Sequence, residues 1–118
     1  MTVSPDGTKR WVNEDGKRNR EDGPAVILSD GSEMWYKNGF THREDGPAAI
    51  FTNGSKFWYR HGKLHREDGP AAIYSAELKE WFLNHKHYSF TEWADKLNLD
   101  QKTKLEMVLK WNPKRLFY

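Results

Sequence analysis

The chain has no cysteine among its 118 residues, and only 36% of its residues are hydrophobic. Without cysteine the fold does not depend on disulfide bonds, so a reducing compartment is compatible with it. No apolar run approaches the ~20 residues of a membrane-spanning helix, and residues 1–6 do not resemble a secretory leader. We therefore expect a cytoplasmic protein that binds no membrane.

Mean hydropathy is low, at −0.97, but aromatic residues make up 14% of the chain. Disordered segments are poor in aromatic residues, and aromatic side chains bury large areas. The composition therefore favours one folded domain. A net charge of +2, from 19 basic and 17 acidic residues, does not by itself indicate nucleic-acid binding.

The hexapeptide Arg-Glu-Asp-Gly-Pro-Ala occurs three times. Its copies begin 23 residues apart, at Arg20, Arg43 and Arg66. The same interval separates three tryptophans, Trp35, Trp58 and Trp81. A fixed interval of this size predicts an array of one supersecondary unit, in which each unit packs against its neighbours.

Each unit carries the signals of a β-hairpin. Residues 25–29 and 32–37 have the composition of strands, and Asp30-Gly31 between them is preferred in two-residue type I′ turns. That loop length predicts Ile27 opposite Met34 and, in the next unit, Ile50 opposite Phe57. A second turn signal follows, as Asn38-Gly39 and again as His61-Gly62. In the last unit these signals weaken, with Ala76-Glu77 in place of the first turn and His85 in place of the second glycine.

From Ser89 the period becomes helical. Ser89 and Glu92 have the spacing of a capping box, and the apolar positions that follow share one helical face: Phe90, Trp93, Ala94 and Leu97. A second helix is predicted from about Gln101 to Trp111, capped by Asp100. Its apolar face consists of Leu105, Val108 and Leu109. We expect both apolar faces to be used in packing and the pair to cover the open end of the sheet.

The sequence therefore predicts a mainly β protein with a small α part. Residues 1–88 form tandem 23-residue β-hairpin repeats in one twisted antiparallel sheet, and residues 89–118 form a C-terminal helical cap and a tail. An open sheet edge is compatible with a monomer or a homodimer.

Residues 35–39, Trp-Tyr-x-Asn-Gly, followed by His-Arg-Glu-Asp-Gly-Pro-Ala at 42–48, resemble a divergent MORN-type repeat. The resemblance covers roughly residues 6–88, and the helical end is similar to that of bacteriophage examples. It implies stacked β-hairpins and a scaffold or binding role. The glycine-rich spacing of eukaryotic MORN units is missing, so their lipid binding is not expected.

The Arg-Glu-Asp triplets should stack along one edge of the array. One interpretation is a charged ledge that docks a partner or a cation. We favour solvated turns in which each arginine pairs with a neighbouring carboxylate, since exposed ion pairs are usually local and weak. The acidic spacing of a calcium-binding loop is absent.

Aromatic residues alternate along the predicted strands, so one row must face each side of the sheet. One row belongs to the core. The other is either a groove for a peptide, base or nucleotide, with basic residues nearby, or it is covered by the C-terminal helices through Phe90, Trp93 and Leu97. We favour cover for the C-terminal units. The candidate partner-binding residues are Trp35, Tyr36, Arg43, Trp58, Tyr59, Arg60 and Arg66, with Lys56 and Lys63 as further basic neighbours.

No catalytic or metal-binding motif emerges. The spacing of His85 and His87 suits one strand face, but no third metal ligand accompanies them. The serines lie in predicted turns, and paired carboxylates have no predicted apolar pocket to shift their pKa values. We expect no enzymatic activity, no cofactor and no metal.

The C-terminal region offers two further interpretations. The helical pair is either a cap or a helix-turn-helix with Lys102, Lys104 and Lys110 on phosphates, and we favour the cap. The tail at residues 111–118 has basic residues followed by three apolar ones, a pattern that suits docking into a partner.

The function we predict is a non-enzymatic protein-binding module, a small phage accessory protein that engages or inhibits a host protein in the host cytoplasm. The phage assignment rests on the resemblance alone. The alternative is nucleotide or single-stranded nucleic-acid binding through an aromatic and basic face.

Overall fold

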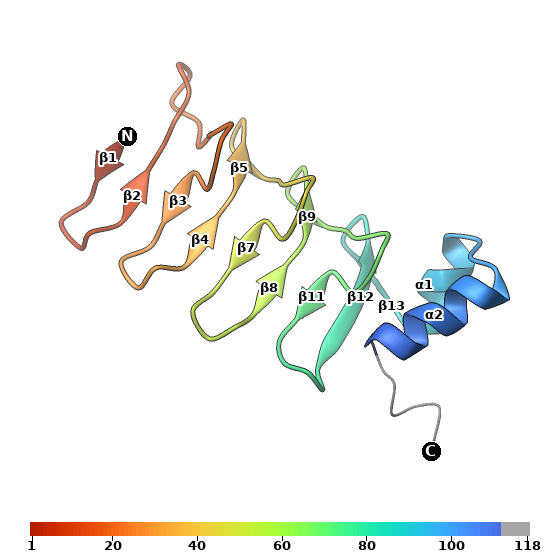
Figure 1. The fold of residues 1–118 in the computed structure, drawn as a ribbon. Helices are drawn as coiled ribbons and strands as arrows, with labels where there is room; N and C mark the ends of the chain where they lie inside the picture. Colours follow the sequence, from red (N-terminus) through yellow and green to blue (C-terminus); the bar gives the residue numbers. More distant parts are fainter. Residues whose placement is uncertain (112–118) are drawn as a thin grey trace.

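The computed structural model describes residues 1–111 and shows a mainly β protein with two C-terminal helices (Figure 1). Its principal element is a nine-stranded antiparallel sheet with the order β1-β2-β3-β4-β7-β8-β11-β12-β13. The Cα atoms extend over 51 × 26 × 21 Å, so the molecule is elongated. The N-terminus lies at one end of the long axis and the helices at the other (Figure 1).

All but two strands of the main sheet are two residues long. They are β1 (Thr2–Val3), β2 (Lys9–Arg10), β3 (Val26–Ile27), β4 (Glu33–Met34), β7 (Ala49–Ile50), β8 (Lys56–Phe57), β11 (Ala72–Ile73), β12 (Lys79–Leu83) and β13 (Lys86–Tyr88). Two separate hairpins pair β5 (Tyr36–Lys37) with β6 (Phe40–Thr41) and β9 (Tyr59–Arg60) with β10 (Lys63–Leu64).

The predicted pairing within the hairpins is wrong by one residue. The observed pairs are Val26 with Met34, Ile27 with Glu33, Ala49 with Phe57 and Ile50 with Lys56. The reason is a three-residue loop, because the Leu28 N–H donates to the Ser32 carbonyl at 2.8 Å. Gly31, with φ of 94°, takes the left-handed position that such loops require.

The predicted strand at residues 32–37 is divided at Trp35. The Trp35 N–H donates to the Ala48 carbonyl at 2.7 Å, in the main sheet, whereas the Trp35 carbonyl accepts from the His42 N–H at 3.0 Å. The chain therefore leaves the main sheet at this tryptophan and enters the second hairpin, β5–β6. Each unit consequently holds two hairpins rather than one.

The second turn signal is confirmed. Asn38 and Gly39 have φ of 49° and 86°, the two positive values that a type I′ turn needs. In the last unit Asn84 and His85 keep this turn, with φ of 50° and 72°. A side chain thus occupies the left-handed position that glycine takes in the other units.

The core of the sheet consists of small side chains. The buried hydrophobic residues of the array are Ala25, Val26, Ala48, Ala49, Ala71 and Ala72. They directly follow the Gly-Pro of each hexapeptide. Because these side chains are short, neighbouring backbone can approach them closely. Most of the larger aromatic side chains of the array are only half-buried.

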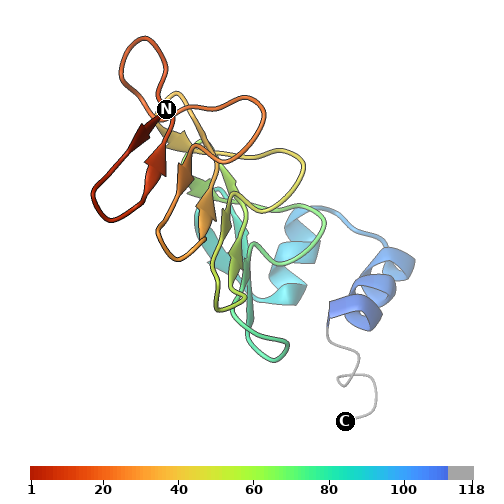
Figure 2. The same ribbon diagram turned by 60° about the vertical axis from the view of Figure 1, so that its left-hand side comes forward.

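The two helices are α1 (Phe90–Lys96) and α2 (Gln101–Trp111). The predicted capping box is confirmed, with Ser89 and Glu92 exchanging both hydrogen bonds. The Asp100 carboxylate accepts from the Thr103 N–H at 2.7 Å, as expected of a cap. α1 packs on β12 and β13, and α2 lies beside α1 (Figure 1 and Figure 2).

The expectation that α2 uses its whole apolar face in packing is wrong. Leu105 and Leu109 are 50% and 51% exposed. The Lys104 ammonium joins α2 to α1 through Asp95, at 2.8 Å. Neither helix in the described part of the chain is long and apolar enough to cross a membrane.

Candidate protein-binding clefts

Each hexapeptide places its arginine over a tryptophan of the preceding hairpin. The guanidinium carbon lies 3.9 Å from the ring centroid for Arg20 over Trp11, 4.0 Å for Arg43 over Trp35 and 3.8 Å for Arg66 over Trp58. A cation over an indole face is attracted by the ring's quadrupole, more strongly when water is displaced. The contact fixes the charged loop to the sheet.

The same arginine also closes its own loop. In the second copy, the Arg43 Nε donates to Asp45 at 2.9 Å and the Arg43 Nη1 donates to the Pro47 carbonyl at 3.1 Å. The first and third copies form the same two bonds. The hydrogen bond from Arg43, together with its charge, lowers the pKa of the Asp45 carboxyl. The predicted pairing of each arginine with a neighbouring carboxylate is confirmed.

Two clefts separate consecutive hexapeptide loops. The first cleft, about 500 Å³, lies between residues 20–24 and residues 42–45 and is also lined by residues 35–37. The second cleft, about 590 Å³, lies between residues 43–46 and residues 65–68 and is also lined by Trp58 and Arg60. The loops on both sides of each cleft are fixed by their own arginine bonds.

The third gap, between residues 66–70 and α1, is filled by the helical cap. The Trp93 Nε1 donates to the Arg66 carbonyl at 2.9 Å, and the Trp93 ring lies 4.6 Å from that of Trp81. The Trp111 ring covers the outer face of the Arg66 guanidinium, at 4.9 Å. Arg66 is thus held between two indoles, those of Trp58 and Trp111.

Exposure distinguishes the filled gap from the open clefts. The side chain of Arg66 is 11% exposed, whereas those of Arg20 and Arg43 are 25% and 23% exposed. Gly69 and Pro70 are buried, and the corresponding residues of the other two loops are only half-buried. The first and second clefts are therefore open counterparts of a site that the chain fills for itself.

The cap begins where a fourth hexapeptide is due. Ser89 lies 23 residues after Arg66, and it is the residue that caps α1. Within residues 1–111 no arginine lies over Trp81. This ring is covered instead by Phe90 and Trp93, at 5.1 and 4.6 Å between ring centroids. The predicted cover of the C-terminal aromatic residues by the helices is confirmed for this tryptophan.

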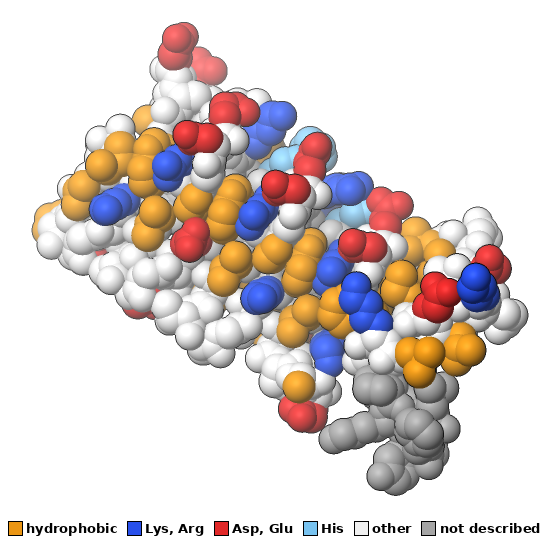
Figure 3. Space-filling model, viewed as in Figure 1, with side chains coloured by type: hydrophobic (Ala, Val, Ile, Leu, Met, Phe, Trp, Pro, Cys, Tyr) orange, Lys and Arg blue, Asp and Glu red, His pale blue; other side chains and the backbone are white. Residues whose placement is uncertain are grey.

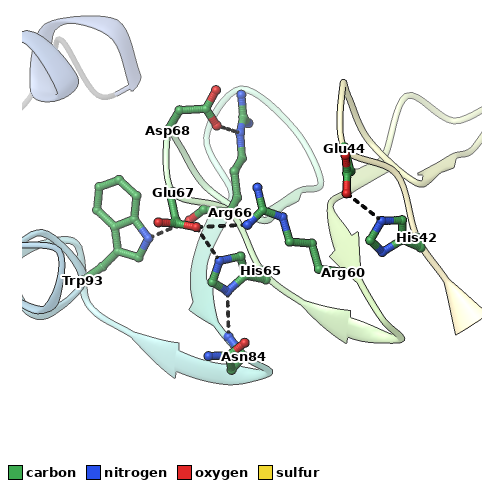
Figure 4. A network of polar contacts seen from close by, with 9 residues as sticks. All are labelled: His42, Glu44, Arg60, His65, Arg66, Glu67, Asp68, Asn84 and Trp93. Carbon is green, nitrogen blue, oxygen red and sulfur yellow. Dashed lines mark hydrogen bonds and ion pairs between the residues drawn. The ribbon is translucent and has the colours of Figure 1, made fainter.

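A polar network lies next to the second and third hexapeptide loops (Figure 4). The His42 Nδ1 accepts from the His61 N–H at 3.0 Å, and the His65 Nδ1 accepts from the Asn84 N–H at 3.0 Å. The other ring nitrogen of each faces a glutamate, Glu44 at 3.4 Å and Glu67 at 3.0 Å.

Glu67 is the centre of this network, and its carboxylate also pairs with Arg60 at 3.1 Å (Figure 4). The hydrogen bond from His65, assisted by the charges of His65 and Arg60, holds the pKa of Glu67 below its ordinary value. The carboxylate therefore stays ionised to a lower pH than a free glutamate.

The structure brings most of the predicted site residues to these clefts. Trp35, Tyr36 and Arg43 line the first, and Arg43, Trp58, Arg60 and Arg66 line the second. Tyr59 lines neither, and burial raises the pKa of its hydroxyl. Lys56 and Lys63, expected near an aromatic groove, also lie outside the two linings.

The cleft rims are acidic. Glu44 and Asp45 are 79% and 86% exposed, far more than the arginines beneath them. Figure 3 shows Asp and Glu groups standing out in a row along one edge of this face. The triplets were predicted from the sequence, but the stacking of arginine on tryptophan was not. The sequence does carry a signal for it, the spacing of eight residues from Trp35 to Arg43.

Within residues 1–111, no group of three or more His, Asp or Glu side chains has an arrangement that could hold a metal ion. The His85 Nδ1 accepts from the Leu64 N–H at 3.3 Å, and the ring of His87 lies against Phe82, so these two histidines have separate surroundings. Except for Trp111, the predicted docking tail at residues 111–118 falls outside the described residues.

Comparisons with family models, with curated proteins and with solved structures found no match to this chain.

Proposed function

We propose that the chain is a non-enzymatic protein-binding module, a small phage accessory protein that engages or inhibits a host protein in the host cytoplasm. The observation that carries the proposal is the pair of open clefts between arginine-anchored loops, next to a third that the cap fills with two tryptophans. Binding sites of this kind are preformed, which reduces the entropy lost on association. The phage assignment rests on the resemblance to MORN-type repeats.

The electrostatics support binding rather than catalysis. General acids in enzymes carry raised pKa values, whereas the shifted carboxyls of the loops, Asp45 and Glu67, have lowered ones. The arginines of the clefts are already paired with carboxylates. Such groups present a fixed charge pattern to a partner.

Nucleotide or single-stranded nucleic-acid binding is the second candidate. The presence of Arg43, Arg60 and Arg66 with Trp58 in one cleft favours it, because bases stack on aromatic rings and phosphates bind guanidinium groups. The exposed carboxylates on the same rim oppose it by repelling phosphates. We therefore rank it below protein binding.

Affinity capture distinguishes protein binding from nucleic-acid binding. The tagged full-length chain is incubated with bacterial lysate, with and without nuclease, and bound proteins are identified by mass spectrometry. A stoichiometric protein that survives nuclease supports the proposal. Capture that is lost with nuclease makes nucleic acid the ligand and overturns the proposal.

A further inference from the structure

We propose that the first and second clefts bind aromatic side chains, flanked by basic residues, from the partner protein. This inference rests on the proposed function and names the chemistry of its partner. The molecule supplies the template, because the third gap holds the aromatic side chains of its own cap. The open clefts repeat the groups that hold those side chains.

The first shared group is the outer face of a guanidinium. Trp58 covers the inner face of Arg66 at 3.8 Å, and Trp111 covers the outer face at 4.9 Å. The Trp35 ring covers the inner face of the Arg43 guanidinium in the same way, with 4.0 Å between the guanidinium carbon and the ring centroid. Its outer face lines the second cleft, so a ring from a partner completes the same arrangement.

The second shared feature is the space left by a glycine. A Cβ on Gly69 would lie 2.8 Å from the Trp111 Cζ2, so the ring packs directly on the glycine backbone. A Cβ on Gly46 or Gly23 would meet only the arginine of its own loop, at 3.1 and 3.2 Å. The surface on which Trp111 packs is therefore present and vacant in both open clefts.

The third shared group is a backbone acceptor. The Trp93 Nε1 donates to the Arg66 carbonyl. The corresponding carbonyls of Arg20 and Arg43 receive no donor from within residues 1–111. An indole N–H or a tyrosine hydroxyl from a partner supplies such a donor, since buried aromatic residues with a polar atom usually find a hydrogen-bond partner.

The charge of the cleft rim favours basic residues beside the aromatic ring of the partner. The first cleft is lined by four carboxylates, on residues 21, 22, 44 and 45, against three cations, on residues 20, 37 and 43. Asp22 and Asp45 are each 86% exposed, whereas the arginines beneath are about one quarter exposed. A partner therefore meets negative charge first, and lysine or arginine next to its aromatic residue fits the rim. The internal template has this chemistry, because the Lys110 ammonium lies 5.0 Å from the Trp111 ring.

The test uses the full-length chain and a synthetic peptide with the sequence of residues 104–111, Lys-Leu-Glu-Met-Val-Leu-Lys-Trp, blocked at both ends. NMR titration follows the Nε–H signals of the arginines. We expect the peptide to shift Arg20 and Arg43 strongly and Arg66, which also lines the second cleft, much less, because Trp111 already covers the outer face of Arg66. The same peptide with alanine in place of its tryptophan should shift none of them.

A blocking variant makes the test specific. The Gly23→Ala, Gly46→Ala double variant places a methyl group where the ring must pack, and its peptide affinity should fall by about tenfold or more. Its unfolding midpoint is measured in parallel. If the variant does not fold, the Glu21→Lys, Glu44→Lys variant replaces it by reversing the rim charge, with Glu14→Lys, Glu77→Lys as the matched control away from both clefts.

Peptide binding with no arginine shift, or with equal affinity in the blocked and native chains, overturns the inference. Shifts confined to the exposed face of α2, around Leu105 and Leu109, also overturn it. Nuclease-resistant capture of the same host protein by the native and rim-reversed chains would leave the proposed function standing and reject the clefts as its site.

Discussion

Arg66 lies over the indole of Trp58, with its guanidinium carbon 3.8 Å from the ring centroid. The same arginine donates from Nε to Asp68 at 2.8 Å and from Nη1 to the Pro70 carbonyl at 3.1 Å. One side chain thus anchors a charged loop to the sheet and also sets the shape of that loop. The equivalent contacts in the two other copies make this pair the structural basis of the clefts.

Replacement of Arg43 by lysine should destabilise the chain although the charge is kept. An ammonium cannot form both the Asp45 and the Pro47 bonds while it stacks on Trp35. We expect Arg43→Lys to lower the free energy of unfolding by about 1–3 kcal/mol, measured by urea denaturation. Arg18→Lys is the control, because Arg18 is exposed and lies 5.5 Å from the Tyr36 ring. Equal losses in both variants would contradict the role given to the stack.

Equivalent glycines should differ in their tolerance of alanine. At Gly69 the added Cβ would lie 2.8 Å from Trp111, whereas at Gly46 it meets only the flexible end of Arg43, at 3.1 Å. We expect Gly69→Ala to displace the Trp111 ring and cost about 1–3 kcal/mol more than Gly46→Ala. Thermal unfolding and the indole NMR signal of Trp111 measure the two effects. An unmoved Trp111 signal would show that the cap does not depend on this contact.

The buried side chain of His42 should be replaceable by asparagine but not by leucine. At the corresponding position of the preceding unit, the Asn19 Oδ1 accepts from the Asn38 N–H at 2.9 Å, as the His42 Nδ1 accepts from the His61 N–H. His42→Asn keeps an acceptor, whereas His42→Leu leaves a part-buried N–H without one, at about 1–3 kcal/mol. Chemical denaturation of both variants checks this, and a fully tolerated leucine would refute it.

Acid should weaken the network around Glu67. Its pKa is lowered from 4.5 in the folded chain, first by the hydrogen bond from His65 and then by the charges of His65 and Arg60. The unfolded chain therefore takes up the proton first as pH falls. The stability contribution is fully present above the unfolded pKa and is lost as pH falls through the folded one. We expect the difference in unfolding free energy between the native chain and Glu67→Gln to shrink as the pH falls below 4.5. Denaturation series across pH measure this difference, with Glu14→Gln as the control. A difference that stays constant down to acid unfolding would contradict this.

Local signals in the sequence predicted much of the fold. Asn38-Gly39, the Ser89 capping box and the Asp100 cap each act through a few neighbouring residues, and all three are confirmed. The predicted hairpin register is wrong because Asp30-Gly31 suits both a two-residue and a three-residue loop. The choice between them depends on the Leu28 to Ser32 bond, which needs the paired strands in place.

The clefts were less predictable than the elements around them. The triplets and tryptophans were identified, but the contact between Arg43 and Trp35 is a tertiary one formed where the strand leaves the sheet. The docking of Trp111 on Gly69 joins residues 42 positions apart, and no local pattern encodes it. The sequence carries one sign of the helical cap, because Ser89 stands where the 23-residue interval places the arginine of a fourth hexapeptide.

Site-specific photocrosslinking in lysate tests most directly whether the two clefts are the binding surface. Glu44 lines both clefts, whereas Glu77 is exposed and lines neither. Full-length chains that carry p-benzoylphenylalanine at one of these two positions are irradiated in nuclease-treated lysate. We expect one protein to be crosslinked from position 44 and none from position 77. Absence of a crosslink at 44, or the same crosslink from both positions, would contradict the assignment of the clefts as the binding surface.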